Sequence, residues 1–397
     1  SLSLKVIIFG FIFTFFSSFG QSFFLGLFNS SIRDTLSITQ GQFGTIYASA
    51  TLLSSFLLIW VGKKIDDINI FKFAFFVTLL LSFSCFFFSK ISSIAFLFIA
   101  IFLMRFSGQG MMSHTATTTI SRYFTKSRGK ALSTSWFGLS TAEFILPVLI
   151  VYLLTITAWQ NIWVSISILV LIFLPITSFA LVKNLNFDSR EETKKEDNKN
   201  IKQWKRIDVL KDYRFYVVCL NMLAMPWIAT GVFVYQSFIT ESKDWGTFVI
   251  AQSFMVYSIL SVITLLVSGF LIDKFTSRKL LIFMNIPLLF STLVLIFFHN
   301  PLTSFIFLGL IGISNGLANV LGSSTWAEIY GVKHIGSIKA LTTALMVFST
   351  AFGTALFGLL IDKGYSIEQI AFVSSTYIFL SILLLFFVRN KLNPQYI

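Results

Sequence analysis

Long apolar runs, separated by short polar gaps, dominate the chain. A helix needs about 20 mainly apolar residues to cross a bilayer, and windows of about this size lie at 6–27, 44–61, 70–88, 93–114, 131–154, 161–182, 214–237, 246–271, 279–298, 303–326, 339–361 and 368–388. Helices are expected because lipid leaves no backbone group unpaired, and the runs are too long for barrel strands. The pattern predicts an all-α integral membrane protein with 12 transmembrane helices, six in each half.

The two halves share features at a nearly constant spacing. Gly62 and Gly269 lie 207 residues apart, and so do Asp66 and Asp273. Two further matches have offsets of 206 and 209 residues: Gly110 with Gly316, and Lys130-Ala131-Leu132 with Lys339-Ala340-Leu341. Such a repeat indicates a duplicated unit. We expect an N-terminal half at 1–182, a linker at 183–213 and a C-terminal half at 214–397.

Composition and charge agree with a membrane protein. Charged residues make up 12% of the chain, against about 25% in soluble domains. Most basic residues fall in loops that share one side of the membrane with both termini and the linker, whereas Arg33, Lys90, Lys243 and Lys363 fall on the other side. By the positive-inside rule, this predicts a multi-pass protein of the inner or plasma membrane with both termini cytoplasmic. The net charge of +13 is then a topology signal and implies contact with membrane lipids but not with nucleic acid.

Signals for catalysis or cofactors do not occur in the sequence. Cys85 and Cys219 lie inside apolar runs, so neither a disulfide nor a metal site is expected. His114, His299 and His334 show no metal-ligand spacing, and the chain has no P-loop, dinucleotide fingerprint or Ser-His-Asp set. The sequence predicts a protein that is not an enzyme, has no cofactor and acts as a monomer.

The loop between the second and third spans of each half carries a short motif. It consists of a glycine, an aspartate four residues later and basic residues beyond. The matching residues are Gly269, Asp273, Lys274, Arg278 and Lys279 in the second half, and Gly62 and Asp66 in the first half, where Asp67 replaces the usual basic residue. Together with the six-plus-six repeat, this pattern resembles the major facilitator superfamily.

The resemblance implies two six-helix bundles and a cytoplasmic gate built from these motif residues and Arg128. A glycine there permits close helix approach, and a carboxylate is stabilised at the positive end of a helix dipole. Around Arg105 the pattern is similar to bacterial relatives of the monocarboxylate and oxalate–formate transporters, although the arginine which that family carries in span 8 is absent here.

Arg105 and Glu143 are charges predicted to lie deep in the membrane. Each costs roughly 2.5–3.5 kcal/mol at the bilayer centre, so both should face protein or a water-filled cavity. Their predicted depths agree within about 5 Å. They form a static ion pair, a substrate and proton site, or never meet. In the second case Arg105 holds an anionic group and Glu143 accepts a proton.

Other polar residues of the spans are further candidates for the substrate site. They are Gln21, Gln109, Asn221, Trp227, Tyr235, Gln236, Tyr257, Asn315 and Asn319. The alternative is that they hold helices together, because small and amide residues also do this in membranes.

The predicted function is secondary active transport of a small organic solute. An organic anion, with monocarboxylates favoured and protons as coupling ion, fits Arg105 and Glu143 in symport by alternating access. Two alternatives remain: a proton-coupled efflux carrier for apolar or cationic compounds, and a membrane sensor that does not transport.

Overall fold

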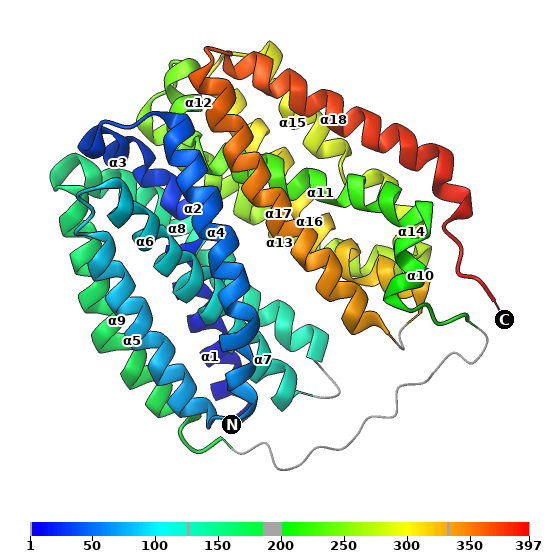
Figure 1. Ribbon diagram of the computed structural model, residues 1–397, viewed down its shortest axis with the longest axis horizontal. Helices are drawn as coiled ribbons and strands as arrows, with labels where there is room; N and C mark the ends of the chain where they lie inside the picture. The colour runs from blue at the N-terminus through cyan, green and yellow to red at the C-terminus, as the bar shows by residue number, and fades with distance from the viewer. Residues whose placement is uncertain (1, 125–127, 186–200, 332–333, 397) are drawn as a thin grey trace. The chain divides into compact units, whose positions relative to one another are not determined.

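The computed structural model describes residues 2–124, 128–185, 201–331 and 334–396 (Figure 1). Regular structure in these ranges is helical, apart from one isolated bridge between Ile201 and Tyr396. Within the same ranges, 12 helical stretches are long and apolar enough to cross a membrane. The predicted all-α fold with 12 spans is therefore confirmed.

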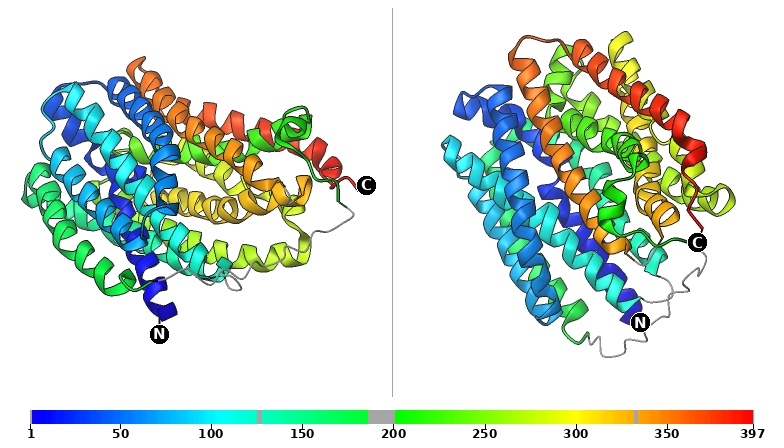
Figure 2. Two further views of the ribbon diagram at one scale, coloured as in Figure 1. Left: turned by 60° about the horizontal axis from the view of Figure 1, so that its bottom comes forward. Right: turned by 45° about the vertical axis from the view of Figure 1, so that its right-hand side comes forward.

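Contacts between Cα atoms divide the chain into two compact units. Unit 1 comprises Ser1–Thr193 with Phe233–Ser237, and unit 2 comprises Lys194–Val232 with Phe238–Ile397. Close helix pairs build each unit: α1 packs on α8 and α5 on α9 in unit 1, and α13 packs on α16 and α15 on α18 in unit 2 (Figure 2).

Unit 1 begins with helices that are interrupted more often than the sequence predicts. Its elements are α1 (Leu2–Ser17), η1 (Ser18–Gly20), α2 (Ser22–Leu25), η2 (Gly26–Phe28), α3 (Asn29–Leu36), α4 (Gln40–Val61), η3 (Gly62–Asp66), α5 (Ile70–Phe88), α6 (Ile94–Met104), the π-helix η4 (Arg105–Met112), α7 (Ser113–Tyr123), α8 (Arg128–Ile156) and α9 (Trp159–Val182). The expected continuous span 6–27 is wrong in detail, because Gln21 is extended (φ −84°, ψ 154°) and ends the first helix.

Unit 2 consists of similar long helices. Its elements are α10 (Arg206–Leu210), α11 (Tyr213–Val234), α12 (Gln236–Ser242), α13 (Thr247–Phe275), α14 (Ser277–Leu280), η5 (Leu281–Phe283), α15 (Ile286–Phe297), α16 (Thr303–Tyr330), α17 (Ile335–Asp362), α18 (Ile367–Val388) and η6 (Arg389–Lys391). The first two residues of α12 are grouped with unit 1.

The predicted span 279–298 is also broken, near Asn285. Pro287 follows the break and lacks the N–H that a continuous helix would use. Ser314 of α16 supplies the missing partners, since its Oγ donates to the Met284 carbonyl at 2.8 Å and accepts from the Leu288 N–H at 2.9 Å. Side-chain groups can thus satisfy an interrupted helix inside a membrane.

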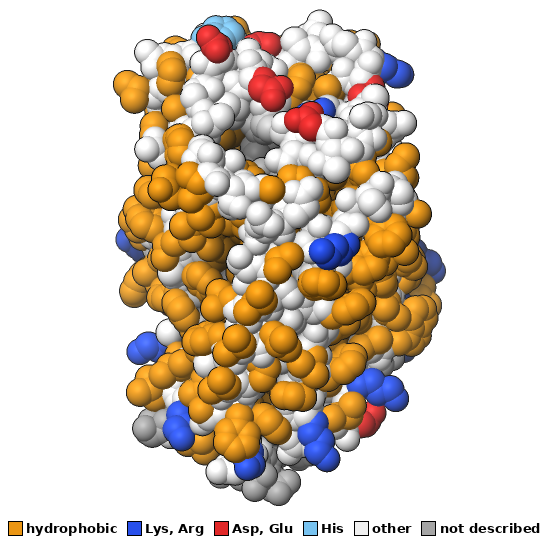
Figure 3. Space-filling model, turned by 90° about the vertical axis from the view of Figure 1, so that its left-hand side faces the viewer, with side chains coloured by type: hydrophobic (Ala, Val, Ile, Leu, Met, Phe, Trp, Pro, Cys, Tyr) orange, Lys and Arg blue, Asp and Glu red, His pale blue; other side chains and the backbone are white. Residues whose placement is uncertain are grey.

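Large apolar side chains cover the outside of the spans. On α18, for example, Phe372 and Phe387 are 65% and 70% exposed. Hydrophobic side chains dominate the face drawn in Figure 3. Such surfaces are too large and too apolar for water, and they fit a hydrocarbon environment.

Candidate functional site

Arg105 lies buried in unit 1 at the start of η4, with 5% of its surface exposed. Its Nη1 donates to the Gly20 carbonyl at 2.8 Å. The guanidinium carbon stands 5.4 Å from the centroid of the Tyr47 ring, within cation–π range. Its Nε–H meets no acceptor in the described chain. Because a guanidinium has five N–H donors, Arg105 keeps donors for an anionic ligand.

Two glycines bring the Gly20 carbonyl within reach of Arg105. A Cβ added to Gly108 would lie 2.7 Å from the Gly20 nitrogen, and one added to Gly20 would collide with the Met104 carbonyl. Without side chains at both positions, η1 packs directly on η4. The wide turns of η4 begin at this crossing, and π-helical turns are frequent at functional sites.

Tyr47, which the sequence analysis did not select, completes the surroundings of Arg105. It is 1% exposed, and its hydroxyl has no hydrogen-bond partner in the described chain. Thr51 follows one turn later on α4, and its buried Oγ1 is likewise without a partner there. The helix that carries both residues packs on α6 and η4. A signal was present in the sequence: Gln40, Tyr47, Thr51 and Ser54 form a polar stripe at helical spacing.

Glu143 lies on α8 and is 8% exposed. Within the described chain no ion pair joins it to Arg105, so the static pair weighed from the sequence is not formed here. The turn η1 packs against both η4 and α8. The arginine and the glutamate therefore belong to elements that meet at the same break in the first span.

The remaining candidates of unit 1 lie around breaks in its helices. Gln21 is half-buried at the extended residue after η1, and Gln109 is half-buried within η4. The hydroxyl of Tyr235 donates to the Gln40 carbonyl at 3.4 Å, and Gln236 Nε2 donates to the Phe23 carbonyl at 3.0 Å. These last two side chains hold backbone together within unit 1.

In unit 2, the candidates on α16 contribute to helix packing. Asn315 Nδ2 donates to Ser261 Oγ of α13 at 2.8 Å. A Cβ on Gly312 would collide with the backbone of Tyr257, which is itself buried. Asn319, one turn beyond Asn315, is exposed. The contacts of Asn315 and Tyr257 therefore favour the packing interpretation.

Two candidates on α11 are buried in different surroundings. Trp227 stacks edge-on against Tyr377 and Phe357, with ring centroids 5.3 and 6.2 Å away. The Asn221 carbonyl accepts a bond from Asn285 Nδ2, while both polar atoms of the Asn221 side chain lack partners in the described chain. Trp227 Nε1 on the same helix likewise has no hydrogen-bond partner in the described chain, so both residues of α11 have polar atoms available.

In the first half, side chains of α7 contact the backbone of the motif loop, and Arg122 Nη1 donates to the Ile65 carbonyl at 3.1 Å. His114 Nε2 donates to the Gly62 carbonyl at 2.8 Å, and a Cβ on Gly62 would lie 3.3 Å from that ring nitrogen. The side chains of Asp66 and Arg128 lie outside the described part of the chain.

In the second half the acidic group that caps the loop is not the motif aspartate. Asp273, Lys274 and Lys279 are exposed and Arg278 is half-buried. Glu328 of α16 accepts the backbone N–H groups of Ser277 and Arg278 at 2.8 and 3.0 Å. A Cβ on Gly269 would meet nothing within 4 Å, so close packing does not explain this glycine within unit 2.

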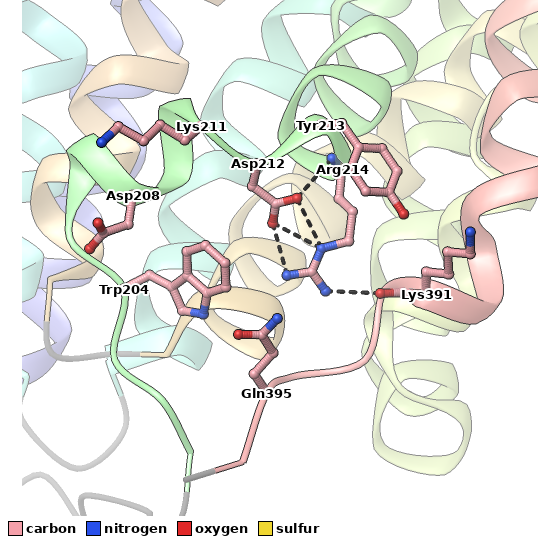
Figure 4. Close-up of a pocket in the computed structure, with 8 residues that line it drawn as sticks. All are labelled: Trp204, Asp208, Lys211, Asp212, Tyr213, Arg214, Lys391 and Gln395. Carbon is pink, nitrogen blue, oxygen red and sulfur yellow. Dashed lines mark hydrogen bonds and ion pairs between the residues drawn. The ribbon is translucent and has the colours of Figure 1, made fainter.

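A second buried arginine, Arg214, lies in unit 2 and is fully engaged (Figure 4). Its Nε donates to Asp212 Oδ2 at 2.8 Å, and its Nη2 lies 2.8 Å from the same oxygen. Its Nη1 donates to the carbonyls of Lys391 and Asn393 at 2.8 and 3.1 Å. Tyr330 donates its hydroxyl to Asp212 Oδ2 at 3.1 Å. This cluster ties the start of α11 to the C-terminal segment.

No cluster of three or more metal-ligating side chains occurs among the described residues. The polar groups that unit 1 offers near the break in its first span are a guanidinium, hydroxyls and a carboxyl group.

Comparisons with solved structures show the fold. A bacterial homologue of the human lysosomal transporter Spinster, in an inward-facing and unoccupied conformation, matches with a TM-score of 0.74 at 11% identity over 100% of this chain and 99% of that chain. The nucleoside transporter NupG matches with a TM-score of 0.71 at 13% identity over 99% of both chains.

Comparisons of sequence show the family. No curated protein matches the chain significantly. A family model described as Major Facilitator Superfamily matches residues 10–284 and 216–396, which together cover nearly the whole sequence. The chain therefore belongs to the Major Facilitator Superfamily of membrane transporters.

Proposed function

We propose that this transporter carries a small organic anion, with monocarboxylates the favoured class, in symport with protons by alternating access. The observation that carries the proposal is Arg105. It is buried, its Nη1 bonds one backbone carbonyl, and its Nε has no acceptor in the described chain. A permanently charged group with spare donors suits a carboxylate, which it can bind bidentately.

Glu143 is the proposed proton carrier. Its carboxyl is buried on α8 and forms no ion pair with Arg105. Ionisable groups inside membranes mark proton relays and substrate paths. In this proposal the Glu143 carboxyl takes a proton while Arg105 holds the anion. The proton and the anion then cross the membrane together.

Thermal stability of the purified protein tests the anion site. Formate, lactate, oxalate and benzoate are added in turn to the wild type, to Arg105→Gln and to the control Arg389→Gln, whose arginine is exposed. We expect at least one carboxylate to stabilise the wild type and the control, since a ligand stabilises the state that it binds. The same shift in Arg105→Gln would show that Arg105 does not bind the anion.

Uptake into proteoliposomes tests the coupling. For the carboxylate that stabilises the protein, we expect wild-type uptake to rise with an inward proton gradient. Uptake by Glu143→Gln should be the same with and without the gradient. Equal gradient dependence in both proteins rules Glu143 out as the coupling group.

A proton-coupled efflux carrier is the second candidate. The observations that favour it are the carboxyl of Glu143, which forms no ion pair within the described chain, and the aromatic cluster around Trp227, which suit an apolar or cationic compound. For such a carrier, an inward proton gradient drives substrate out of the vesicles. Uptake should therefore fall, rather than rise, when the gradient is applied. A sensor instead shows binding without flux.

We further propose that residues 183–213 link two six-helix halves and that the motif loops 62–72 and 269–279 share the cytoplasmic side with both termini. The distribution of basic residues supports this topology. Labelling of single cysteines at Lys64 and Lys274 with an impermeant reagent tests it. Equal accessibility from one side is expected, and labelling from opposite sides contradicts the proposal.

A further inference from the structure

A row of exposed apolar residues runs along α10 and the start of α11. Ile207, Leu210, Tyr213 and Tyr216 follow one another at steps of three residues, and each is between 40% and 66% exposed. Val209, by contrast, is fully buried in the core of unit 2. The segment is therefore amphipathic: one side packs into the core of unit 2, and the other exposes an apolar row.

The row is held in a fixed position at the end of a spanning helix. The Tyr216 hydroxyl donates to the Leu210 carbonyl at 2.7 Å, which ties α11 to α10. Asp212, between the two helices, pairs with Arg214 of α11, and the backbone N–H of Trp204 donates to the Tyr330 carbonyl at 3.1 Å. Because the candidate span of α11 begins at Tyr213, α10 lies directly next to the end of that span.

Basic side chains surround the row. Residues 201–216 contain five basic and two acidic residues. Asp212 is neutralised by Arg214, and Asp208 Oδ2 accepts the Lys205 backbone N–H at 3.3 Å. Lys211 and Lys391 lie on either side of the Asp212–Arg214 pair (Figure 4). Both are exposed, and both line a pocket of about 420 Å³.

We propose that this surface, formed by Ile207, Leu210, Tyr213, Lys211 and Lys391, binds anionic phospholipids. The acyl region lies against the apolar row, which includes the exposed start of α11, and the lysines hold the phosphates. A short amphipathic helix with basic flanks is the pattern of an interfacial anchor. Its residues belong to unit 2 and are not among those of the proposed anion site.

Lipid retention by the full-length protein tests the proposal. Purified protein is equilibrated with equal amounts of phosphatidylglycerol and phosphatidylcholine in mixed micelles, and bound lipids are counted by native mass spectrometry. We compare the wild type, Lys211→Gln/Lys391→Gln, and the control Lys90→Gln/Lys363→Gln, which removes two exposed lysines elsewhere. Melting temperatures verify that every variant is folded.

We expect the wild type and the control to retain phosphatidylglycerol preferentially and the Lys211/Lys391 variant to lose about tenfold or more of that preference. Ile207→Ser/Leu210→Ser should lower retention of both lipids at this surface. Unchanged preference in the Lys211/Lys391 variant, or an equal loss in the control, overturns the proposal. So does displacement of the lipid by glycerol 3-phosphate at equal concentration, since the apolar row would then contribute nothing.

Discussion

Arg105 and Arg214 are equally buried but differ in what surrounds them. Arg214 donates to a carboxylate and to two backbone carbonyls, and its guanidinium carbon lies 5.6 Å from the Trp204 ring centroid. Arg105 bonds one carbonyl, faces Tyr47 and has an Nε without an acceptor in the described chain. Burial alone therefore does not distinguish a structural arginine from one available to a ligand. The two differ in how many guanidinium N–H groups already have an acceptor in the protein.

The largest expected effect is on stability at Arg214. Arg214→Met leaves the Asp212 carboxylate buried without its partner and frees the C-terminal carbonyls. Such a loss typically costs about 3–5 kcal/mol. Denaturant unfolding in detergent measures it, with Arg389→Met as a control at an exposed arginine. A loss no larger than that of the control contradicts the structural role of Arg214.

Two buried tyrosines give the next contrast. Tyr330→Phe removes the hydroxyl that donates to Asp212, and hydrogen bonds to charged groups contribute about 1.5–3 kcal/mol. Tyr47→Phe removes a hydroxyl that has no partner in the described chain, so its stability should stay within about 0.5 kcal/mol of the wild type. Denaturant unfolding measures both variants. Equal losses of unfolding free energy in Tyr330→Phe and Tyr47→Phe would show that the two hydroxyls do not differ in their contribution to stability.

Of the two buried arginines, Arg105 should show the smaller stability effect. Arg105→Met breaks one hydrogen bond but also removes a charge that no carboxylate of the described chain pairs with, so we expect a net loss of about 1 kcal/mol or less. If Arg105→Met destabilises the protein as much as Arg214→Met, then Arg105 is a structural residue. The proposal that Arg105 binds the anion would then be wrong.

Much of the fold was predictable because a membrane span is a local property of the sequence. Twelve windows of sufficient length and apolarity correspond to 12 helical stretches in the described chain. The breaks after Ser17 and near Asn285 were not predicted. They depend on partners distant in sequence, namely η4 against Gly20 and Ser314 against the freed backbone groups.

The candidate site was predictable only in part, for the same reason. Arg105 stands out because a charge interrupts an apolar run. Tyr47 did not stand out. Its polar neighbours on α4 do not reveal that its ring lies against the guanidinium of Arg105. Arg214 was missed as well, because it bonds carbonyls that lie 177 and 179 residues away along the chain. Glu328 caps the second motif loop from another helix, 51 residues from Ser277.

Flux through Arg105→Gln shows whether Arg105 binds the transported anion. The carboxylate that stabilises the wild type is followed into proteoliposomes containing equal amounts of folded wild-type or variant protein. We expect the variant to lose at least about tenfold in initial rate, since a charge-assisted contact of about 1.5 kcal/mol or more is removed from the bound anion. Equal rates at equal melting temperatures would show that the solute crosses without Arg105.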